Sequence, residues 1–451
     1  MDFKLLKTAE GIQQIYETQA RRFKNLDDVQ LLINHSNAAK KISNDMHNNY
    51  GLRAKVQKIF RTACDASETN FLVLNDCTIP DEKFEQYIAT LNKAELRALL
   101  KFFDEKNEKL EKLLINCEKE RDNILKNIGN IVHDSVPISN NEDNNVIIKE
   151  WGNKRVGNFE SHYDLLPKIG LDTNRGSKVA GNRGYFLTGD IARLQLAIIS
   201  YATDFLNEKE YRLIIPPYYM NREHMSKVAQ LEQFDEELYH VSHSDNKDDY
   251  KYLIATSEQP IASYYADEIL DNSQLPLKYC GYSTNFRREA GSHGRECGGI
   301  FRVHQFDKIE QFVFCRPEES WNIMENMIKI SEEFYQSLEI PYRIINIVSG
   351  ALNNSASKKY DLEGWFPGSQ TYRELVSCSN CTDYQSRNMN IMYMDPNDKN
   401  KKKYVHTLNS TLCALTRTIC ILCETHLDNG VVKLPKVLTK YFGNDIINLK
   451  N

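Results

Sequence analysis

The stretch TNFRREAGSHGRECGGIFRVHQFDKIEQFVF, residues 284–314, determines the fold of this chain. Both of its ends are apolar, and a run of Gly, Ser, His and Arg over residues 291–299 separates them. Two strand-like segments joined by a flexible polar loop predict a long β-hairpin. Side chains of a strand alternate between its two faces, so Arg302, Phe306 and Glu310 share one face of the returning strand. They are spaced roughly 13 Å apart, at about 3.3 Å per residue.

This face offers a cation, an aromatic ring and a carboxylate in a line. Such an arrangement suits an extended ligand with a phosphate, a flat base and an ammonium group, as in ATP joined to an amino acid. Arg287 on the outgoing strand can face the same surface and bind a phosphate or carboxylate through two parallel hydrogen bonds. A solvated hairpin with cross-strand ion pairs would explain the same pattern without a ligand.

Other nucleotide-binding and hydrolase signatures are absent from the sequence. We find no glycine-rich P-loop, no G-x-G-x-x-G after a strand and no serine nucleophile elbow. Formation of an adenylate needs neither a protein nucleophile nor a general base, because a substrate carboxylate attacks the α-phosphorus of ATP directly. Such a site needs arginines, carboxylates and one stacking ring, and this chain supplies them.

The pattern F-R-x-E followed by V-H-Q-F-x-K-I-E resembles motif 2 of the class II aminoacyl-tRNA synthetases, and the whole string is similar to cytosolic eukaryotic seryl-tRNA synthetases. Two later blocks, YDLEGWFPGS (360–369) and RELVSCSNCTDYQ (373–385), share this similarity, which extends over essentially the whole chain. The resemblance implies an α+β fold, with an antiparallel class II sheet flanked by helices and an N-terminal antiparallel coiled-coil arm. It also implies a homodimeric serine–tRNA ligase that uses L-serine, ATP with Mg²⁺, and tRNA(Ser).

A seven-residue repeat predicts two long N-terminal helices. The first spans about 27–63, where Arg53 interrupts the apolar row, and the second spans roughly 93–132, or about 60 Å. The second repeat is the cleaner one and runs through Leu96, Phe103, Leu110, Cys117, Ile124 and Ile131. A repeat of this length predicts a coiled coil, and the broken segment between the helices predicts an antiparallel hairpin. A dimerisation or spacer module is the alternative function of such a hairpin.

Basic residues of the first helix lie outside its core rows or interrupt them, and alone they indicate a solvated face. Because seryl-tRNA synthetases grip tRNA with this arm, the resemblance makes them expected phosphate contacts, which would be sensitive to salt. With a loop arginine of the 284–314 hairpin, the expected tRNA contacts are Lys40, Lys41, Arg53, Lys55, Lys58, Arg61 and Arg295. The expected domains are a tRNA-binding domain over 1–135, a linker over 136–150 and a catalytic domain over 151–451. Motifs 1, 2 and 3 are expected at about 189–217, 284–314 and 406–427.

The resemblance also assigns the site residues. Arg287 bridges the α-phosphate and the serine carboxylate, Phe306 stacks on adenine, and Arg302 reaches the outer phosphates. The expected ATP contacts are Arg287, Glu289, Arg302, Val303, His304, Gln305, Phe306, Glu374, Leu375, Val376, Ser377 and Arg417. The expected serine contacts are Thr256, Glu258, Arg287, Glu310, Asn409 and Thr411. The expected catalytic residues are Arg287, Glu374 and Arg417, and Glu374 and Ser377 are expected to hold Mg²⁺.

The amino-acid composition restricts the possible partners, location and cofactors of the chain. The net charge of −5 gives no global nucleic-acid signature, so RNA contacts must come from local basic patches. No apolar run is long enough to span a membrane and the N-terminus lacks a signal-peptide core, so we expect a cytoplasmic protein. The eleven cysteines indicate reduced thiols. The pairs Cys378-x-x-Cys381 and Cys420-x-x-Cys423 suggest zinc, but buried thiols are the favoured interpretation and no zinc is expected.

The sequence departs from the family pattern at two places. Cys297-Gly298-Gly299 replaces a second arginine near the hairpin tip, and Asn388 replaces one of two paired arginines, which puts the tRNA-transfer step in doubt. Two other functions are compatible with the pattern. A catalytically inactive paralogue would bind only RNA or a partner, and a class II synthetase for another amino acid would share the arginines.

Overall fold

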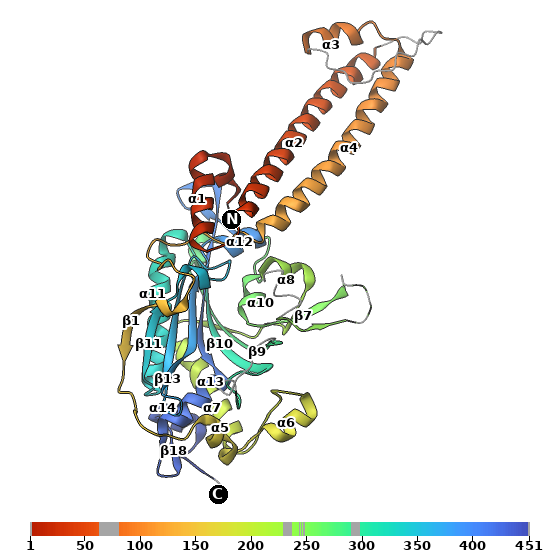
Figure 1. The fold of residues 1–451 in the computed structure, drawn as a ribbon. Helices are drawn as coiled ribbons and strands as arrows, with labels where there is room; N and C mark the ends of the chain where they lie inside the picture. The colour runs from red at the N-terminus through yellow and green to blue at the C-terminus, as the bar shows by residue number, and fades with distance from the viewer. Residues whose placement is uncertain are drawn as a thin grey trace. The chain divides into compact units, whose positions relative to one another are not determined.

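The computed structural model in Figure 1 describes residues 2–62, 81–228, 237–242, 244, 246, 249–289 and 298–449. The chain divides into two compact units. The helical unit comprises Leu6–Ala9 and Asn25–Ile128, and the sheet unit comprises Met1–Leu5, Glu10–Lys24 and Gly129–Asn451.

Two long antiparallel helices form most of the helical unit, α2 over Asp27–Phe60 and α4 over Lys93–Leu125 (Figure 1). The short helix α3, Asp81–Ile88, precedes α4. A capping box starts α4: the Asn92 side chain accepts from the Glu95 N–H at 3.0 Å, and the Glu95 carboxylate accepts from the Asn92 N–H at 2.9 Å. The predicted antiparallel helical hairpin is therefore confirmed.

The contact between α2 and α4 is only partly apolar. Near α3, Val56 and Phe103 are buried in one cluster with Phe84. Farther along, the buried Asn49 Nδ2 donates to Asn107 Oδ1 at 2.6 Å. A buried polar pair of this kind fixes the register of two helices at a cost in stability.

An eight-stranded sheet organises the sheet unit, in the order β1-β11-β12-β13-β16-β10-β9-β4. Its strands are β1 Val146–Trp151, β4 Arg212–Ile214, β9 Leu277–Phe286, β10 Gln305–Cys315, β11 Tyr342–Asn346, β12 Lys358–Phe366, β13 Thr371–Asn380 and β16 His406–Ala414. All neighbours pair antiparallel except β4 and β9, which are parallel. The hairpin predicted over 284–314 is the pair β9–β10, in which Gly281 lies opposite Glu310.

The two faces of the sheet carry different residues. Helices α7 (Asp190–Glu208), α11 (Ser320–Ser337) and α13 (Leu415–His426) share one large apolar core with Ile309 and Val313 of β10. Phe312 and Phe314 belong to a second cluster. Because side chains alternate along a strand, even-numbered residues of β10, including Glu310, face away from the three helices.

The remaining elements surround this sheet. The helices and turns are η1 Phe3–Lys7, α1 Ala9–Arg21, η2 Glu142–Asn144, α5 His162–Leu165, η3 Leu166–Ile169, α6 Thr173–Ala180, α8 Arg222–Val228, α10 Glu258–Ala262, η5 Asn272–Gln274, η7 Pro317–Glu319, η8 Ser349–Ala351, α12 Tyr384–Met389 and α14 Lys436–Phe442. The smaller strands are β2 Leu171–Asp172, β3 Phe186–Leu187, β5 Tyr219–Asn221, β6 His240–Val241, β7 Lys251–Leu253, β8 Ile269–Leu270, β14 Met392–Asp395, β15 Asp398–Tyr404, β17 Leu427–Asp428, β18 Val431–Lys433 and β19 Ile446–Asn448. Among the residues described, no helix is long and apolar enough to cross a lipid bilayer.

Two predicted segments differ from the structure. The helix expected over 93–132 ends at Leu125, because Gly129 and Asn130 bond instead to Gln19 and Asn354. The polar segment 136–150 is not a free linker along its length. Val136 is buried, and β1 begins at Val146 as an edge strand of the main sheet. The domain boundaries remain predictions.

Candidate active site

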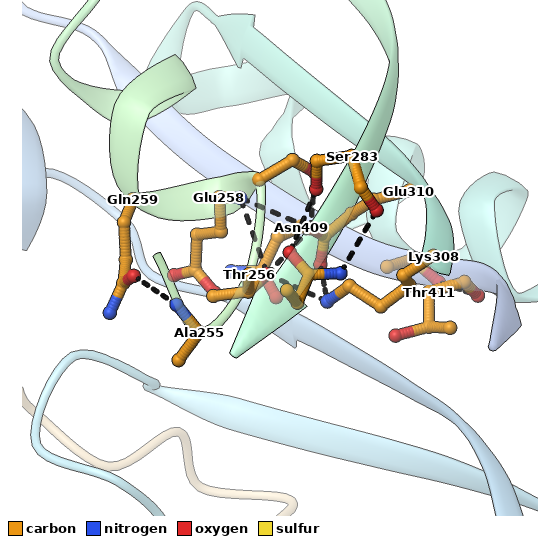
Figure 2. A network of polar contacts seen from close by, with 12 residues as sticks. Ala255, Thr256, Glu258, Gln259, Ser283, Lys308, Glu310, Asn409 and Thr411 are labelled. Carbon is orange, nitrogen blue, oxygen red and sulfur yellow. Dashed lines mark hydrogen bonds and ion pairs between the residues drawn. The ribbon is translucent and has the colours of Figure 1, made fainter. Parts of the chain in front are cut away.

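A network of polar contacts joins β10 to the residues around the start of α10 (Figure 2). Glu310 Oε2 accepts three hydrogen bonds. The donors are the Thr256 hydroxyl at 2.7 Å, the Ser257 hydroxyl at 2.8 Å and the Glu258 main-chain N–H at 3.1 Å. Lys308 Nζ donates to Glu310 Oε1 at 2.8 Å and to the Thr256 hydroxyl at 2.6 Å. Two hydroxyls and one main-chain N–H thus hold a buried ion pair.

Gly281 makes room for this network. A Cβ at this position would lie 2.7 Å from Ser257 Oγ and 2.6 Å from Ile261 Cδ1, which is closer than real contacts allow. Any larger residue would therefore push Ser257 away from Glu310. Glycine fits here because the side chains of Ser257 and Ile261 pack directly against the strand.

A second carboxylate, Glu258, faces the same space. Its Oε1 accepts from Gln385 Nε2 at 2.6 Å, and Gln385 Oε1 accepts from the Thr407 hydroxyl at 2.7 Å. Asn409 and Thr411 are buried on β16 and extend toward the network (Figure 2). The space thus offers carboxylate, hydroxyl and amide groups to a small polar ligand.

The two carboxylates differ in their protonation. Burial opposes the charge of Glu310, but the Lys308 ammonium together with the hydrogen bonds from Lys308, Thr256 and Ser257 outweighs burial and holds the pKa of Glu310 below its ordinary value. Burial, followed by the charge of Glu310, raises the pKa of Glu258 to about 7. The pocket therefore contains one ionised carboxylate, one that exchanges its proton near neutral pH, and one ammonium group.

Arg287 follows directly after β9 and lies beside this pocket. Its N–H donates to the His304 carbonyl at 2.9 Å, which continues the hairpin pairing, and its Nε donates to the Ala255 carbonyl at 3.3 Å. Its guanidinium carbon lies 5.3 Å from the centre of the Phe306 ring. A guanidinium and a ring so placed can hold an anion and a flat base next to each other.

Two arginines flank Glu289, whose backbone has a left-handed φ of 49°. Glu289 Oε2 lies 3.5 Å from Arg302 Nη1 and 3.9 Å from Arg183 Nη1. Arg183 Nη1 also donates to the Glu289 carbonyl at 3.4 Å. Both the side chain and the main chain of Glu289 are therefore held by Arg183.

A third group joins β13 and α13. Arg417 Nη1 donates to the Glu374 carbonyl at 3.0 Å and lies 3.4 Å from Glu374 Oε2. The surrounding protein opposes the charge of Glu374, but Arg417, Lys359 and Arg287 outweigh it and lower the pKa of Glu374. The Glu374 side chain is 48% exposed, so a ligand can reach this ionised carboxylate.

Asp361 of β12 lies opposite Ser377 of β13. It is buried, and its Oδ2 is 3.4 Å from Lys359 Nζ. Its Oδ1 is buried without a hydrogen-bond partner among the residues described. An orphaned carboxylate oxygen therefore lies next to the half-buried Ser377.

Comparison with known proteins identifies the family. Residues 239–426 match the model of the tRNA synthetase class II core domain (G, H, P, S and T). The cytoplasmic serine–tRNA ligase of Dictyostelium discoideum is 48% identical over 436 residues, which are 96% of this chain and 91% of that protein. The crystal structure of the cytoplasmic serine–tRNA ligase of Naegleria fowleri in complex with AMP has a TM-score of 0.89 and 43% identity, and the match covers 100% of this chain and 99% of that one. The crystal structure of seryl-tRNA synthetase from Pyrococcus horikoshii complexed with ATP has a TM-score of 0.87 and 36% identity, with full coverage of both chains.

The chain belongs to the seryl-tRNA synthetases. The resemblance drawn from the hairpin and the two later blocks is therefore confirmed, as is the α+β class II fold. In this member of the family, the residues predicted to contact serine and ATP fall into three groups, around Glu310, around Glu289 and around Glu374. The side chains of Val303, Leu375 and Val376 are buried in the core, so only their main chain is available to a ligand. Arg295 and Cys297 lie outside the described residues.

The basic residues expected to contact tRNA differ in their surroundings. Arg53 Nε lies 2.6 Å from Asp104 Oδ1, and Lys55 Nζ lies 3.1 Å from Glu85 Oε1, so both already have carboxylate partners. The exposed members of the set are Lys40, Lys41, Lys58 and Arg61.

Sequence reasoning missed several residues of the site. Lys308 lies two residues before Glu310, so alternation gives it the same face, and Asp361 lies inside the family block 360–369, but neither received a role. Gln385 ends the family block 373–385 but also received no role, and Arg183 comes from a segment with no ligand-binding pattern. Their positions follow only from the folded structure.

The two cysteine pairs lie in the core. All four thiols are buried and free, and burial raises the pKa of the Cys378 thiol to about 12. The residues described contain no group of three or more His, Cys, Asp or Glu side chains that could hold a metal ion. The absence of zinc remains a prediction.

Proposed function

We propose that this chain activates L-serine with ATP to form seryl-adenylate and pyrophosphate, and then transfers the seryl group to the 3′-terminal adenosine of tRNA(Ser). The observation that carries the proposal is the Glu310 network beside Arg287, a pocket for an ammonium and a hydroxyl next to a clamp for anions. Family membership supports it, and so do the relatives whose structures contain AMP or ATP.

Adenylation requires alignment of two anions. An oxygen of the serine carboxylate attacks the α-phosphorus, the bond from that phosphorus to the bridging oxygen breaks, and pyrophosphate leaves. Arg287 would contact the serine carboxylate and the α-phosphate together, and Phe306 would stack on adenine. Arg302 and Arg417 would neutralise the outer phosphates. No general base is needed, because the carboxylate is already ionised at neutral pH.

Serine selection would depend on the polar pocket. Glu258 and Glu310 can bind the ammonium group, and a site built to hydrogen-bond the hydroxyl rejects alanine strongly because buried polar groups would otherwise go unpaired. Asn409 and Thr411 line the same space. Exclusion of threonine would rest on steric contact alone, which is a weaker filter.

The residues expected to hold Mg²⁺ fit such an ion. Glu374 offers an exposed carboxylate and Ser377 a hydroxyl, and Mg²⁺ prefers oxygen ligands. The orphaned Asp361 Oδ1 opposite Ser377 indicates an acceptor for a hydroxyl proton at this place. When bound, the ion would neutralise charge on the phosphates.

In the second step the 3′ hydroxyl of the terminal adenosine would attack the seryl carbonyl carbon, and AMP would leave. The helical unit would bind the tRNA through its exposed cations, with a salt-dependent contribution that does not read sequence. Arg295 is proposed to contact the acceptor end. We further propose a homodimer, and a cytoplasmic location in line with the names of relatives such as the Dictyostelium discoideum protein.

The test is ATP–pyrophosphate exchange by the purified chain without tRNA, with serine, threonine and alanine offered separately. Exchange with serine alone is expected. No exchange with any amino acid, in protein shown to be folded, would refute the proposal and favour a non-catalytic paralogue. Exchange with threonine or alanine at the rate seen with serine would refute the specificity.

A further inference from the structure

Lys308 is a buried ammonium group inside the pocket proposed for serine. It is 6% exposed and lies two residues before Glu310 on β10. Buried lysines are rare unless they are paired, because removing the charge from water is costly. Lys308 touches two of the residues expected to contact serine, but none of the expected roles includes it.

Counting hydrogen bonds shows what Lys308 does to Thr256. A hydroxyl has one proton and two lone pairs. The Thr256 proton goes to Glu310 Oε2, and the oxygen accepts from Lys308 Nζ at 2.6 Å and from the Glu258 N–H at 3.3 Å. Lys308 therefore occupies one lone pair of the Thr256 hydroxyl, and the other faces a Glu258 N–H that is shared with Glu310.

The same count limits Glu310. An ionised carboxylate has about four acceptor positions, two on each oxygen. Both positions of Oε2 are taken, by the Thr256 and Ser257 hydroxyls and by a Glu258 N–H that is shared with Thr256, and Oε1 accepts one hydrogen bond from Lys308. One acceptor position remains, on Oε1.

We propose that Lys308 is a positioning residue of the serine pocket, which holds Glu310 Oε1 in place and leaves that oxygen one acceptor position for the substrate. This inference rests on the proposed function. Serine would then bind to one oxygen of Glu310 and to Glu258, whose Oε1 already accepts a hydrogen bond from Gln385. Thr256 would hold Glu310 in place through its hydroxyl proton.

Lys308 also sets the charge of the pocket. The charged or titratable groups around the Glu310 carboxylate are Lys308 on its own strand, Glu258 of α10, Arg287 after β9 and the Cys381 thiol near Glu258. Without the ammonium of Lys308, the two carboxylates would retain a proton to a higher pH. Binding of the serine ammonium needs the ionised form, so acidification would then reduce kcat/KM for serine at a higher pH than in the natural chain.

The experiment is serine- and ATP-dependent pyrophosphate exchange from pH 6 to 9 with K308M, which removes the charge but keeps the length. The expected result is a KM for serine raised by about ten- to hundredfold, an unchanged KM for ATP, and an acid limb shifted upward by about one pH unit. K308Q keeps donor hydrogens without charge, so it should recover part of the serine KM but not the position of the acid limb. A purely structural role would lower activity equally at every pH.

The matched control is K358M. Lys358 is a buried lysine of the same sheet at 7% exposure, near Glu325 and Tyr360 and outside the pocket. Its substitution should leave the serine KM and the acid limb unchanged.

A double-mutant cycle with T256V supplies a second measurement that does not depend on K308M folding. Because Lys308 and Thr256 hold the same carboxylate, the effects of K308Q and T256V on the serine KM should be non-additive. Additive effects, or an unchanged serine KM and acid limb in folded K308M, would overturn the inference while leaving the proposed function intact. No exchange by the natural chain would refute both.

Discussion

At the residue scale, each arginine that is expected to contact ATP already contacts another side chain of the protein. Arg302 lies near Glu289, Arg417 near Glu374, and Arg287 over Phe306. Partly exposed ion pairs contribute little to stability, so a phosphate can replace the carboxylate partner at small cost. The carboxylates therefore hold the guanidinium groups near the positions where charge will arrive, which is the preorganisation that catalysis of this kind requires.

Arg183 should matter for ATP although it follows from no sequence motif. It holds the side chain and main chain of Glu289 in a left-handed conformation that a non-glycine residue adopts only at a cost. We expect R183Q to raise the KM for ATP by about tenfold, equivalent to about 1.4 kcal/mol, and to leave the KM for serine unchanged. Pyrophosphate exchange with each substrate varied in turn measures both values.

The control for this prediction is R175Q. Arg175 belongs to the same part of the chain, but its side chain is 80% exposed and its partner is Asp172, the N-cap residue of the same helix α6. Both KM values should stay unchanged in R175Q. A rise in the serine KM of R183Q, or an equal effect of the two substitutions, would contradict a role of Arg183 at Glu289.

Whether a contact of the site could be predicted depends on how far apart its two residues lie in the sequence. Alternation along one strand predicts a common face for Phe306 and Glu310, because a strand's period is local, but Arg302, which was predicted on the same strand, precedes β10, which begins at Gln305. The three donors to Glu310 Oε2 come from residues more than fifty positions away, and their convergence requires Gly281 to leave space. Period and propensity carry no information about such contacts, which depend on the packing of separate elements.

At the element scale, the helical hairpin shows what a heptad pattern does and does not determine. The repeat predicted α2 and α4 correctly, but burial along them is uneven. Leu113 is 55% exposed, and the Asn49–Asn107 pair occupies part of the seam. The end of α4 at Leu125 is set by hydrogen bonds of the following residues, which the apolar row could not reveal.

The helical unit should be separable from the adenylation chemistry. Gln19 bonds to Gly129, and Arg22 Nε donates to the Asn130 carbonyl at 2.9 Å, so the chain leaves and re-enters the sheet unit at neighbouring points. A short Gly-Ser linker in place of residues 26–127 should therefore preserve serine-dependent pyrophosphate exchange. Charging of tRNA(Ser), measured with radiolabelled serine, should be lost. Loss of exchange as well, in folded protein, would show that the helical unit supports the active site.

Substitutions of basic residues test the same role of the helical unit within the intact chain. K40E together with K41E should reduce charging and weaken its dependence on salt, because these residues are exposed and available to phosphates. R53Q should have a smaller effect on tRNA affinity, since Arg53 already pairs with Asp104. Equal effects of the two variants would indicate that availability of the cation does not decide tRNA binding.

At the scale of the whole molecule, β4 ends the main sheet and, among the residues described, pairs with a single strand of it. β4 is an edge strand, where Leu213 is 50% and Ile215 61% exposed, and Leu196 of the neighbouring α7 is 64% exposed. An exposed apolar edge favours association, and a second copy of the chain is the partner expected from the motif 1 position. We expect L196D combined with I215D to shift the protein from dimer to monomer in sedimentation velocity.

The same double variant also tests whether the β4 edge supports the active site. β4 pairs in parallel with β9, the strand that leads to Arg287, so an uncovered β4 should loosen the hairpin that carries the site. The monomer should therefore lose pyrophosphate exchange together with its dimer contacts. I115D, at a comparably exposed position of α4 (58%), should remain dimeric and active in exchange. A natural chain that sediments as a monomer with full exchange activity would show that the motif 1 edge needs no partner.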